Sequence, residues 1–268
     1  MKIIKPDAIE LVQGVGFHSM LQHIEYCGRT CYKSEDKITE DSCHRFVNML
    51  REHAHGAMLE HGTVYLTNNV MDKPLNNYDP EHLLALTKNK YTKVFNVNNF
   101  EYITTNYRVI IENDWEDLLY LQTEPTEYHY KRRTFKITCN RGVSHEFVRH
   151  RVFSFAQESQ RYVNYSKDKF GKEIKVIAPD VLSFNSYDDM GSYLVWRKAC
   201  EDAEIAYFWL LENDATPQEA RDVLPNATAT ELIMTGFESD WEHFFKLRCA
   251  KDAHPQAQEV ANMIKEQF

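Results

Sequence analysis

The chain has 268 residues, and its 31 Lys and Arg against 40 Asp and Glu give a net charge of −9. Hydrophobic residues make up 43 % of the sequence, enough for a sizeable core, while only 9 Gly and 8 Pro are present. This composition excludes a low-complexity or fibrous chain, and the lack of an apolar run of roughly 18 residues argues against a membrane protein.

The N-terminal half predicts two helices followed by strands. A short helix is expected over 17–26, ended by Gly28, and a second over 39–53. The second helix carries an apolar stripe at i, i+3, i+4 and i+7, formed by Cys43, Phe46, Val47 and Leu50. Strands are expected at 63–67 and at 101–111, which is rich in Tyr, Ile, Thr and Val, and a helix is expected at 114–122.

The C-terminal half alternates strands and helices. Residues 134–139 predict a half-buried strand, after which Ser144 is expected to cap a short helix that runs to Arg149. A strand at 174–178 and a long helix at 187–212 follow. Capping boxes begin at Thr216 and at Ser239, the second opening a helix to Arg248, and a last helix starts at 254–255. Without a βαβ rhythm, this order predicts an α+β fold, a mixed sheet flanked by helices, in one domain of residues 1–268.

The thiols and the first residues indicate a cytoplasmic protein. Residues 1–7 lack the apolar stretch of a signal peptide. The six cysteines form no C-x-x-C pair, so reduced thiols are expected.

Positive charge is concentrated in one segment. Residues 129–175 hold 12 Lys and Arg against 4 Asp and Glu, a local charge of +8 in an acidic chain. Such a segment suits an anion, although a solvated basic face is the simpler alternative.

The segment 149–162 has the densest group of functional side chains. It holds three arginines, one histidine, two serines and three amide or acid side chains. Arginine presents planar charged forks suited to phosphate. The segment lacks a Gly-rich phosphate turn, so side chains and loop amides would have to hold a phosphate here.

This segment resembles the R-H-R-x7-S signature of flavin-dependent thymidylate synthases. The matching residues are Arg149, His150, Arg151 and Ser159, followed by Arg161 and Tyr162. Upstream, the family's H-x-S/T-x-x-E-H element is similar to the set His55, Ala57, Glu60 and His61. Downstream, residues 220–225 match its A-R-x-x-L-P element, and 241–248 and 256–259 resemble its L-R and A-Q-x-E region. The matches run in the family's order from about residue 50 to 260.

The sequence departs from the family pattern at four places. Glu146 stands where Gln is usual, and Ala156 and Gln157 stand where Asn and Glu are common. This exchange of acid and amide would keep the donor and acceptor count if both groups reach one uracil ring. Ala57 replaces a hydroxyl residue, so a contact there would use its backbone, and Ser239 replaces an arginine expected to contact the flavin.

The resemblance implies a specific reaction. The family methylates dUMP to dTMP, taking the carbon from methylenetetrahydrofolate and the hydride from a bound FAD that NADPH reduces. No enzyme cysteine attacks the pyrimidine. The resemblance also implies a homotetramer with active sites shared between subunits, and no metal, nucleic-acid or membrane partner.

The resemblance also assigns roles to residues. It implies FAD contacts by Arg149, His150 and Arg151, with Ala57, Gln157 and His243 nearby. It implies that dUMP, chiefly its phosphate, is held by Ser159, Gln160, Arg161 and Arg221. Further substrate contacts are implied for Glu146, Arg149, Gln157 and Glu158. Arg248 is expected to be the catalytic residue, facing the uracil and stabilising the charge that develops at its N3–C4–O4 edge.

Simpler structural roles stay open for these residues. The motif arginines are also compatible with surface ion pairs, Ser159 with a turn cap, and His243 with helix packing. Arg221 has Glu219 and Asp222 as close salt-bridge candidates, and the helix dipole alone favours a cation at Arg248.

Two rival functions come from other features. The set His53, His55, Glu60 and His61 suggests a metal-dependent phosphohydrolase. The basic, aromatic stretch 128–165 suggests an RNA-binding module with steep salt dependence. Cys43 beside His44 hints at a thiol nucleophile, but its place on an apolar stripe predicts a buried structural thiol.

Overall fold

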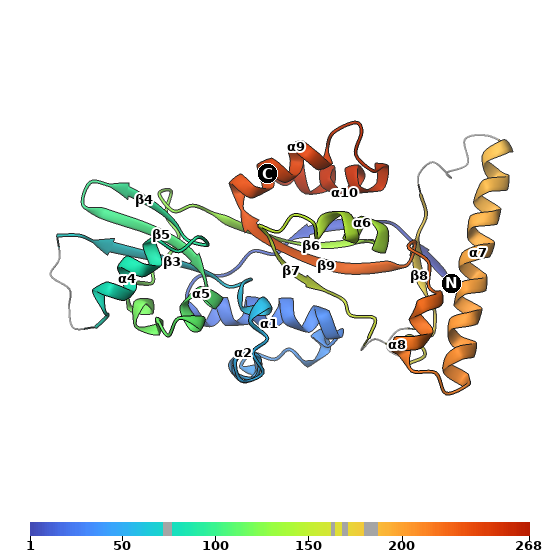
Figure 1. Ribbon diagram of the computed structural model, residues 1–268, viewed down its shortest axis with the longest axis horizontal. Coiled ribbons are helices and arrows are strands. Elements are labelled where there is room, and N and C mark those ends of the chain that lie inside the picture. Colours follow the sequence, from blue (N-terminus) through green and yellow to red (C-terminus); the bar gives the residue numbers. More distant parts are fainter. Residues whose placement is uncertain (72–76, 162–163, 168–170, 180–186) are drawn as a thin grey trace.

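A four-stranded antiparallel sheet lies at the centre of the molecule. The computed structural model describes residues 1–71, 77–161, 164–167, 171–179 and 187–268, so Tyr162 lies outside the described residues (Figure 1). The strand order is β2 (Asp7–Glu10), β6 (Arg132–Asn140), β9 (Ala229–Phe237) and β7 (Ser154–Gln157). β6 and β9 pair over their full length, from Arg132 opposite Phe237 to Asn140 opposite Ala229.

Helices cover both faces of this sheet (Figure 1). On one face, Phe135 and Met234 pack under α6 (Arg141–Phe147), α9 (Glu238–Arg248) and α10 (Pro255–Lys265). On the other face, Ile233 packs with Cys27 of α1 (Phe17–Tyr32). The helices α2 (Ser42–Glu52) and α3 (Gly56–Leu59) complete this second layer. Burial on both sides explains why β9 has consecutive apolar residues.

A second, three-stranded sheet extends from the α1 side. Its order is β3 (Thr63–Asn69), β5 (Phe100–Asn106) and β4 (Lys93–Val97), all antiparallel. The helices α4 (Pro80–Thr87) and α5 (Tyr107–Glu112) and the 3-10 helix η2 (Glu116–Leu121) pack around it. Val64 and Ile103 of this sheet share one core cluster with Met20 and Leu50 of α1 and α2.

The opposite end of the molecule holds a two-stranded parallel sheet, β1 (Lys2–Ile4) with β8 (Lys175–Ile177) (Figure 1). Beside it lie α7 (Tyr187–Glu212), α8 (Pro217–Ala220) and the 3-10 helix η5 (Arg221–Val223), while η1 (Glu35–Lys37) follows α1. Among the described residues, no helix has both the length and the apolar character needed to cross a membrane.

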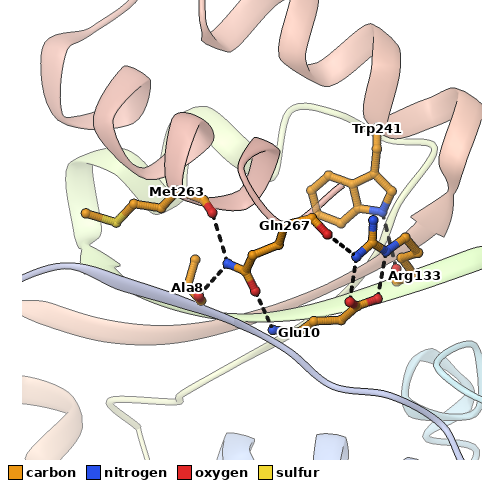
Figure 2. A network of polar contacts seen from close by, with 6 residues as sticks. All are labelled: Ala8, Glu10, Arg133, Trp241, Met263 and Gln267. Carbon is orange, nitrogen blue, oxygen red and sulfur yellow. Dashed lines mark hydrogen bonds and ion pairs between the residues drawn. The ribbon is translucent and has the colours of Figure 1, made fainter.

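A polar network around Gln267 ties the C-terminal helix to the central sheet (Figure 2). The Gln267 Nε2 donates to the carbonyl of Ala8 at 2.8 Å, and its Oε1 accepts from the backbone N–H of Glu10 at 3.2 Å. Arg133 forms a two-pronged ion pair with Glu10 at 2.6 and 2.5 Å and also donates to the Gln267 carbonyl. The carbonyl of Arg133 accepts from the indole N–H of Trp241. The network therefore joins β2, β6, α9 and the end of α10.

The predicted α+β class is confirmed, but the predicted end of the first helix is wrong. α1 continues through Gly28 to Tyr32. A Cβ at Gly28 would lie 2.7 Å from the Phe46 ring of α2. Glycine therefore allows α2 to pack closely on α1 and does not end the helix.

Four further predictions needed correction. The strand expected at 101–111 ends at Asn106, whose side chain accepts from the Val109 N–H and starts α5. Asn140, and not Ser144, caps the helix before the arginine motif, because its side chain accepts from Val143. α9 begins at Glu238, one residue before the predicted box, and the segment expected as a helix at 114–122 is the 3-10 helix η2.

Candidate active site

Arg248 at the end of α9 contacts the arginine motif across a large sequence separation. Its Nε donates to the Nε2 of His150 at 2.8 Å. Its Nη1 donates to a carboxylate oxygen of Glu146 at 2.8 Å, and its Nη2 to the Glu146 carbonyl at 2.7 Å. Three residues predicted for the site therefore meet, and we call them the Arg248 cluster. Arg149 approaches the same carboxylate at 3.2 Å, but its side chain is 69 % exposed.

The protonation of the Arg248 cluster follows from these contacts. The hydrogen bond from Arg248 lowers the pKa of Glu146, which keeps this carboxylate ionised. Burial and the charge of Arg248 lower the pKa of His150 to about 4, so the imidazole is neutral near pH 7. Its Nε2 accepts from Arg248, which places the ring proton on Nδ1. Because Arg248 uses three of five N–H donors within the described structure, two remain for a ligand.

A cavity of about 730 Å³ lies between α3, β4, β7 and the start of α9; we call it the arginine cavity. Two residues predicted for the flavin, Ala57 and Arg151, line it. Its other lining residues include Lys90, Tyr91, Lys93, Arg132, Phe155, Phe237 and Asp240. The cavity therefore combines several cations with aromatic walls.

Arg132 is a half-buried cation in this wall that sequence reasoning missed. It donates to the Thr63 hydroxyl at 3.3 Å and to the Glu60 carbonyl at 3.0 Å. No carboxylate lies within ion-pair distance of it among the described residues. Desolvation lowers its pKa to about 10, which still leaves it charged near pH 7. A partly desolvated guanidinium without a carboxylate partner favours an anionic ligand.

Lys93 is a second residue that the sequence analysis missed. It contacts Ser239, which stands where the family pattern has an arginine. Its Nζ donates to the Oγ of Ser239 at 2.5 Å. Lys93 thus brings a cation to the position where the resemblance expects an arginine. No local motif marks Lys93, since β4 and α9 are far apart in sequence.

Five of the residues implied for dUMP, from Gln157 to Arg161, lie at the end of β7 or directly after it. The Gln157 amide donates to the hydroxyls of Ser144 at 3.0 Å and Thr230 at 3.3 Å. The Ser159 N–H donates to the Cys31 carbonyl at 2.9 Å, which fixes this loop to the end of α1. The Gln160 side chain is buried, and it interacts with the Tyr165 side chain.

Glu158 lines a second cavity of about 670 Å³, next to β8. Burial raises its pKa, and its carboxylate accepts from the Tyr165 hydroxyl at 3.2 Å. Lys33 approaches it at 3.6 Å and also pairs with Glu231, which in turn pairs with Lys136 at 2.9 Å. Lys33, Lys136 and Glu231 were not singled out from the sequence, because they come from three distant elements.

The single chain does not gather all the predicted residues at one place. Ala57 and Arg151 line the arginine cavity, whereas Glu158 lines the second cavity. Arg161 and His243 are exposed, and Arg221 is half-buried in η5 beside α8. The Arg248 cluster lies on α6 and α9.

The positive segment is not a continuous basic face. Arg133 pairs with Glu10, Lys136 with Glu231, and Arg149 with Glu146. The acidic partners of Arg133 and Lys136 come from outside the segment. Arg132 and Arg151 instead line the arginine cavity.

The residues of the rival metal site do not converge. His61 is buried and contacts the Thr235 hydroxyl at 2.8 Å. Glu60 pairs with Arg108 at 2.6 Å, whereas His53 and His55 are exposed. A phosphohydrolase built on these four residues is therefore not favoured. Cys43 is fully buried, as predicted for a structural thiol.

Comparison with known proteins identifies the family. The family model described as "Thymidylate synthase complementing protein" matches residues 124–268, just over half of the chain. The chain belongs to this family. The match includes the arginine motif and Arg248, whereas Ala57, Lys90 and Lys93 precede it.

Individual relatives agree with this assignment. A flavin-dependent thymidylate synthase of Geobacter sulfurreducens is 34 % identical over 122 residues, which cover 46 % of this chain and 49 % of that protein. One from Pyrococcus furiosus is 29 % identical over 171 residues, covering 62 % and 68 %. The chain thus spans about half the length of the Geobacter relative.

A similar solved structure is the crystal structure of a UMP/dUMP methylase PolB from Streptomyces cacaoi, bound with 5-Br dUMP. The similarity covers 100 % of this chain and 91 % of that chain, with a TM-score of 0.47 and a sequence identity of 17 %.

Proposed function

We propose that this protein methylates dUMP to dTMP, with methylenetetrahydrofolate as carbon donor and a bound FAD that NADPH reduces. The observation that carries the proposal is the Arg248 cluster. Arg248 of the family's C-terminal element bonds Glu146 and His150 at the arginine motif, at 2.7–2.8 Å. The family and the names of its relatives support the same reaction.

The arginine cavity fits a flavin by its chemistry. Its half-buried Arg132 has no carboxylate partner in the described structure, and Lys93 and Arg151 add positive charge. Tyr91 and Phe237 supply aromatic surface. These residues would hold the cofactor, with the Ala57 backbone at the rim. Flavin, when bound, accepts a hydride from NADPH and passes it on.

We assign the other family positions as follows. Arg149, His150, Gln157 and His243 stay proposed flavin neighbours, although they do not line the arginine cavity of the single chain. Ser159, Gln160, Arg161 and Arg221 are proposed to bind dUMP, chiefly its phosphate. The buried amide of Gln160 supports this, because a buried amide group favours polar partners. Arg149, Gln157 and Glu158 are proposed as further dUMP contacts.

Arg248 is proposed to act on the pyrimidine. Glu146 and His150 hold its guanidinium in one orientation, and two N–H donors remain for the uracil edge. A fixed donor pair stabilises negative charge that develops there without reorganising. Glu146 thereby acts as a positioning residue for Arg248.

We also propose that the working enzyme is a homotetramer whose subunits share active sites. The separation of the predicted residues within one chain supports this: a second copy would bring the dUMP residues of one subunit to the arginine cavity of another. Light scattering and the mixing of two variants test it. Arg151→Ala and Arg161→Ala are each expected to be inactive, and their mixed tetramers to recover part of the activity.

The cofactor assignment is tested by the absorbance spectrum. The protein incubated with FAD and desalted is expected to be yellow, and NADPH with dUMP present is expected to bleach it. Lys93→Met and Arg151→Met should each weaken FAD binding, whereas Lys37→Met, an exposed site on η1, should not. A protein that stays colourless with excess FAD contradicts the proposal.

A further inference from the structure

Two histidines and one cysteine meet where α1 crosses α2, outside every part of the proposed active site. His18 stands in the first turn of α1, and Cys43 and His44 in the first turn of α2. The Nδ1 of His18 lies 3.0 Å from the Nε2 of His44 and 3.8 Å from the Sγ of Cys43. The three ligand atoms all lie within 4.8 Å of one another. We call them the α1–α2 triad.

We propose that the α1–α2 triad binds one divalent ion of the zinc class. Imidazole nitrogen and thiolate sulfur are the ligands that zinc prefers. Tetrahedral zinc with bonds of about 2.0 Å to nitrogen and about 2.3 Å to sulfur requires an N···N separation of about 3.4 Å and an N···S separation of about 3.6 Å. The observed separations of 3.0 and 3.8 Å differ from these by a few tenths of an ångström. The third separation, between Cys43 and His44, is at most 4.8 Å, so a bound ion would draw the exposed His44 side chain toward the Cys43 sulfur.

The surroundings of the triad suit a cation that enters from solvent. Cys43 is buried at the base, while both imidazoles are exposed, so a fourth position remains for water. The carboxylates of Glu25 and Asp41 lie close enough to act on Cys43 electrostatically. Arg29 pairs with Glu25 at 2.7 Å, and its guanidinium lies over the Phe46 ring. On binding, the Cys43 thiol gives its proton to solvent and the thiolate bonds the ion.

A metal here would add a link between two helices that are already joined by packing and by a hydrogen bond from the Ser42 hydroxyl to Glu25 at 2.8 Å. α2 lies across α1, almost end-on in Figure 1, and Gly28 and Phe46 form their apolar contact. The ion would therefore stabilise this helix pair without contacting the Arg248 cluster or the arginine cavity. Its binding is independent of the proposed reaction.

Cobalt titration of the metal-free protein tests the site. Co²⁺ is expected to bind once per chain, with a thiolate charge-transfer band in the near ultraviolet and d–d bands in the visible. Cys43→Ser should abolish the charge-transfer band. His18→Ala and His44→Ala, both at exposed positions, should each weaken Co²⁺ and Zn²⁺ affinity at least tenfold. Zn²⁺ should raise the Tm of the wild type and of no triad variant.

His53→Ala is the matched control, because His53 is an exposed histidine at the C-terminal end of α2. This variant should bind Co²⁺ like the wild type. Circular dichroism of the metal-free variants checks their fold. If Cys43→Ser does not fold, the Co²⁺ affinities of His18→Ala and His44→Ala test the proposal. The proposal is overturned if wild-type protein shows no thiolate–cobalt band, or if both histidine variants bind Co²⁺ as tightly as the wild type.

Discussion

The proposed role of Arg248 depends on Glu146 and His150, which fix the orientation of its guanidinium. Its side chain is 16 % exposed and forms an ion pair with Glu146, whose side chain is 27 % exposed. Partial burial of a charge-assisted pair of this kind fixes the guanidinium more firmly than a surface pair would. The charge of a dUMP phosphate is the same throughout the reaction, whereas charge at the uracil edge grows, so Arg248 should affect the chemical step.

We predict that Arg248→Ala lowers turnover by roughly 10²-fold or more, the usual effect of removing one oriented donor. Flavin reduction by NADPH should largely survive, because it needs no uracil contact. Arg248→Lys should restore only part of the rate, since an ammonium lacks the planar fork. Steady-state turnover, dUMP affinity and the rate of flavin bleaching are the measurements.

Arg221→Ala is the matched comparison and should chiefly weaken dUMP binding. If Arg248→Ala turned over normally and only its dUMP affinity fell, Arg248 would be another binding residue. The same conclusion would follow if the two variants had the same kinetic profile.

Arg132→Met tests the half-buried cation of the arginine cavity. We expect FAD affinity to fall at least tenfold, because the cavity loses a cation that has no carboxylate partner among the described residues. The Tm should change little, since removing a partly desolvated charge offsets the loss of two hydrogen bonds. Fluorescence titration with FAD and a thermal melt measure both, with the exposed Arg45→Met as control. Unchanged FAD affinity would exclude Arg132 from the flavin site.

At the scale of elements, the close contact between α1 and α2 depends on Gly28. Its Cβ position lies 2.7 Å from Phe46, a buried ring. We predict that Gly28→Ala lowers the free energy of unfolding, because overpacking costs about 1–3 kcal/mol and helix propensity returns about 1 kcal/mol. Gly191→Ala in α7, where nothing lies within 4 Å, should instead stabilise. Urea titration measures both, and a stabilising Gly28→Ala would refute the packing argument.

Sequence periodicity predicted the elements that are determined by residues close together in the sequence. The stripe of α2 from Cys43 to Leu50 is buried as expected, α7 has the predicted bounds, and the box at Thr216 caps α8. The central strand β9 was missed, because burial on both faces removes the alternation that marks a half-buried strand. The end of α1 was mispredicted because the partner of Gly28, Phe46, comes from another helix.

The sequence motifs predicted those site residues that lie within the motifs themselves. Glu146, His150 and Arg248 were expected to belong to one site, and they meet. Arg132, Lys93 and the α1–α2 triad were not predicted, since each depends on contacts between elements that no short motif joins. The site roles, the single domain and the cytoplasmic location stay predictions.

At the scale of the molecule, two buried histidines link stability to pH. Burial lowers the pKa of His23 to about 4 and that of His61 to about 3, against 6.5 in the unfolded chain. A lowered histidine pKa means that the unfolded state binds more protons, so stability falls as pH drops below 6.5. We predict a loss of about 1 kcal/mol per pH unit for each histidine between pH 6.5 and 5, because the unfolded imidazole is only half protonated at pH 6.5.

Urea titrations at several pH values measure this slope. His23→Gln, which keeps a donor near the Thr134 hydroxyl, should remove about a third of it, because the pKa values of His61 and His150 are lowered as well. Carboxylates contribute little above pH 5, which isolates the histidines. A stability that is flat between pH 6.5 and 5 would contradict the burial of both imidazoles as neutral rings.

The central claim, flavin-dependent methylation of dUMP, is tested most directly by product analysis. Purified protein loaded with FAD is incubated with dUMP, methylenetetrahydrofolate and NADPH under low oxygen, and nucleotides are separated by chromatography. We predict that dTMP forms only when all four components are present, and that Arg248→Ala forms at most about one hundredth as much per unit time. Absence of dTMP from flavin-loaded protein, or its formation without flavin, would contradict the account.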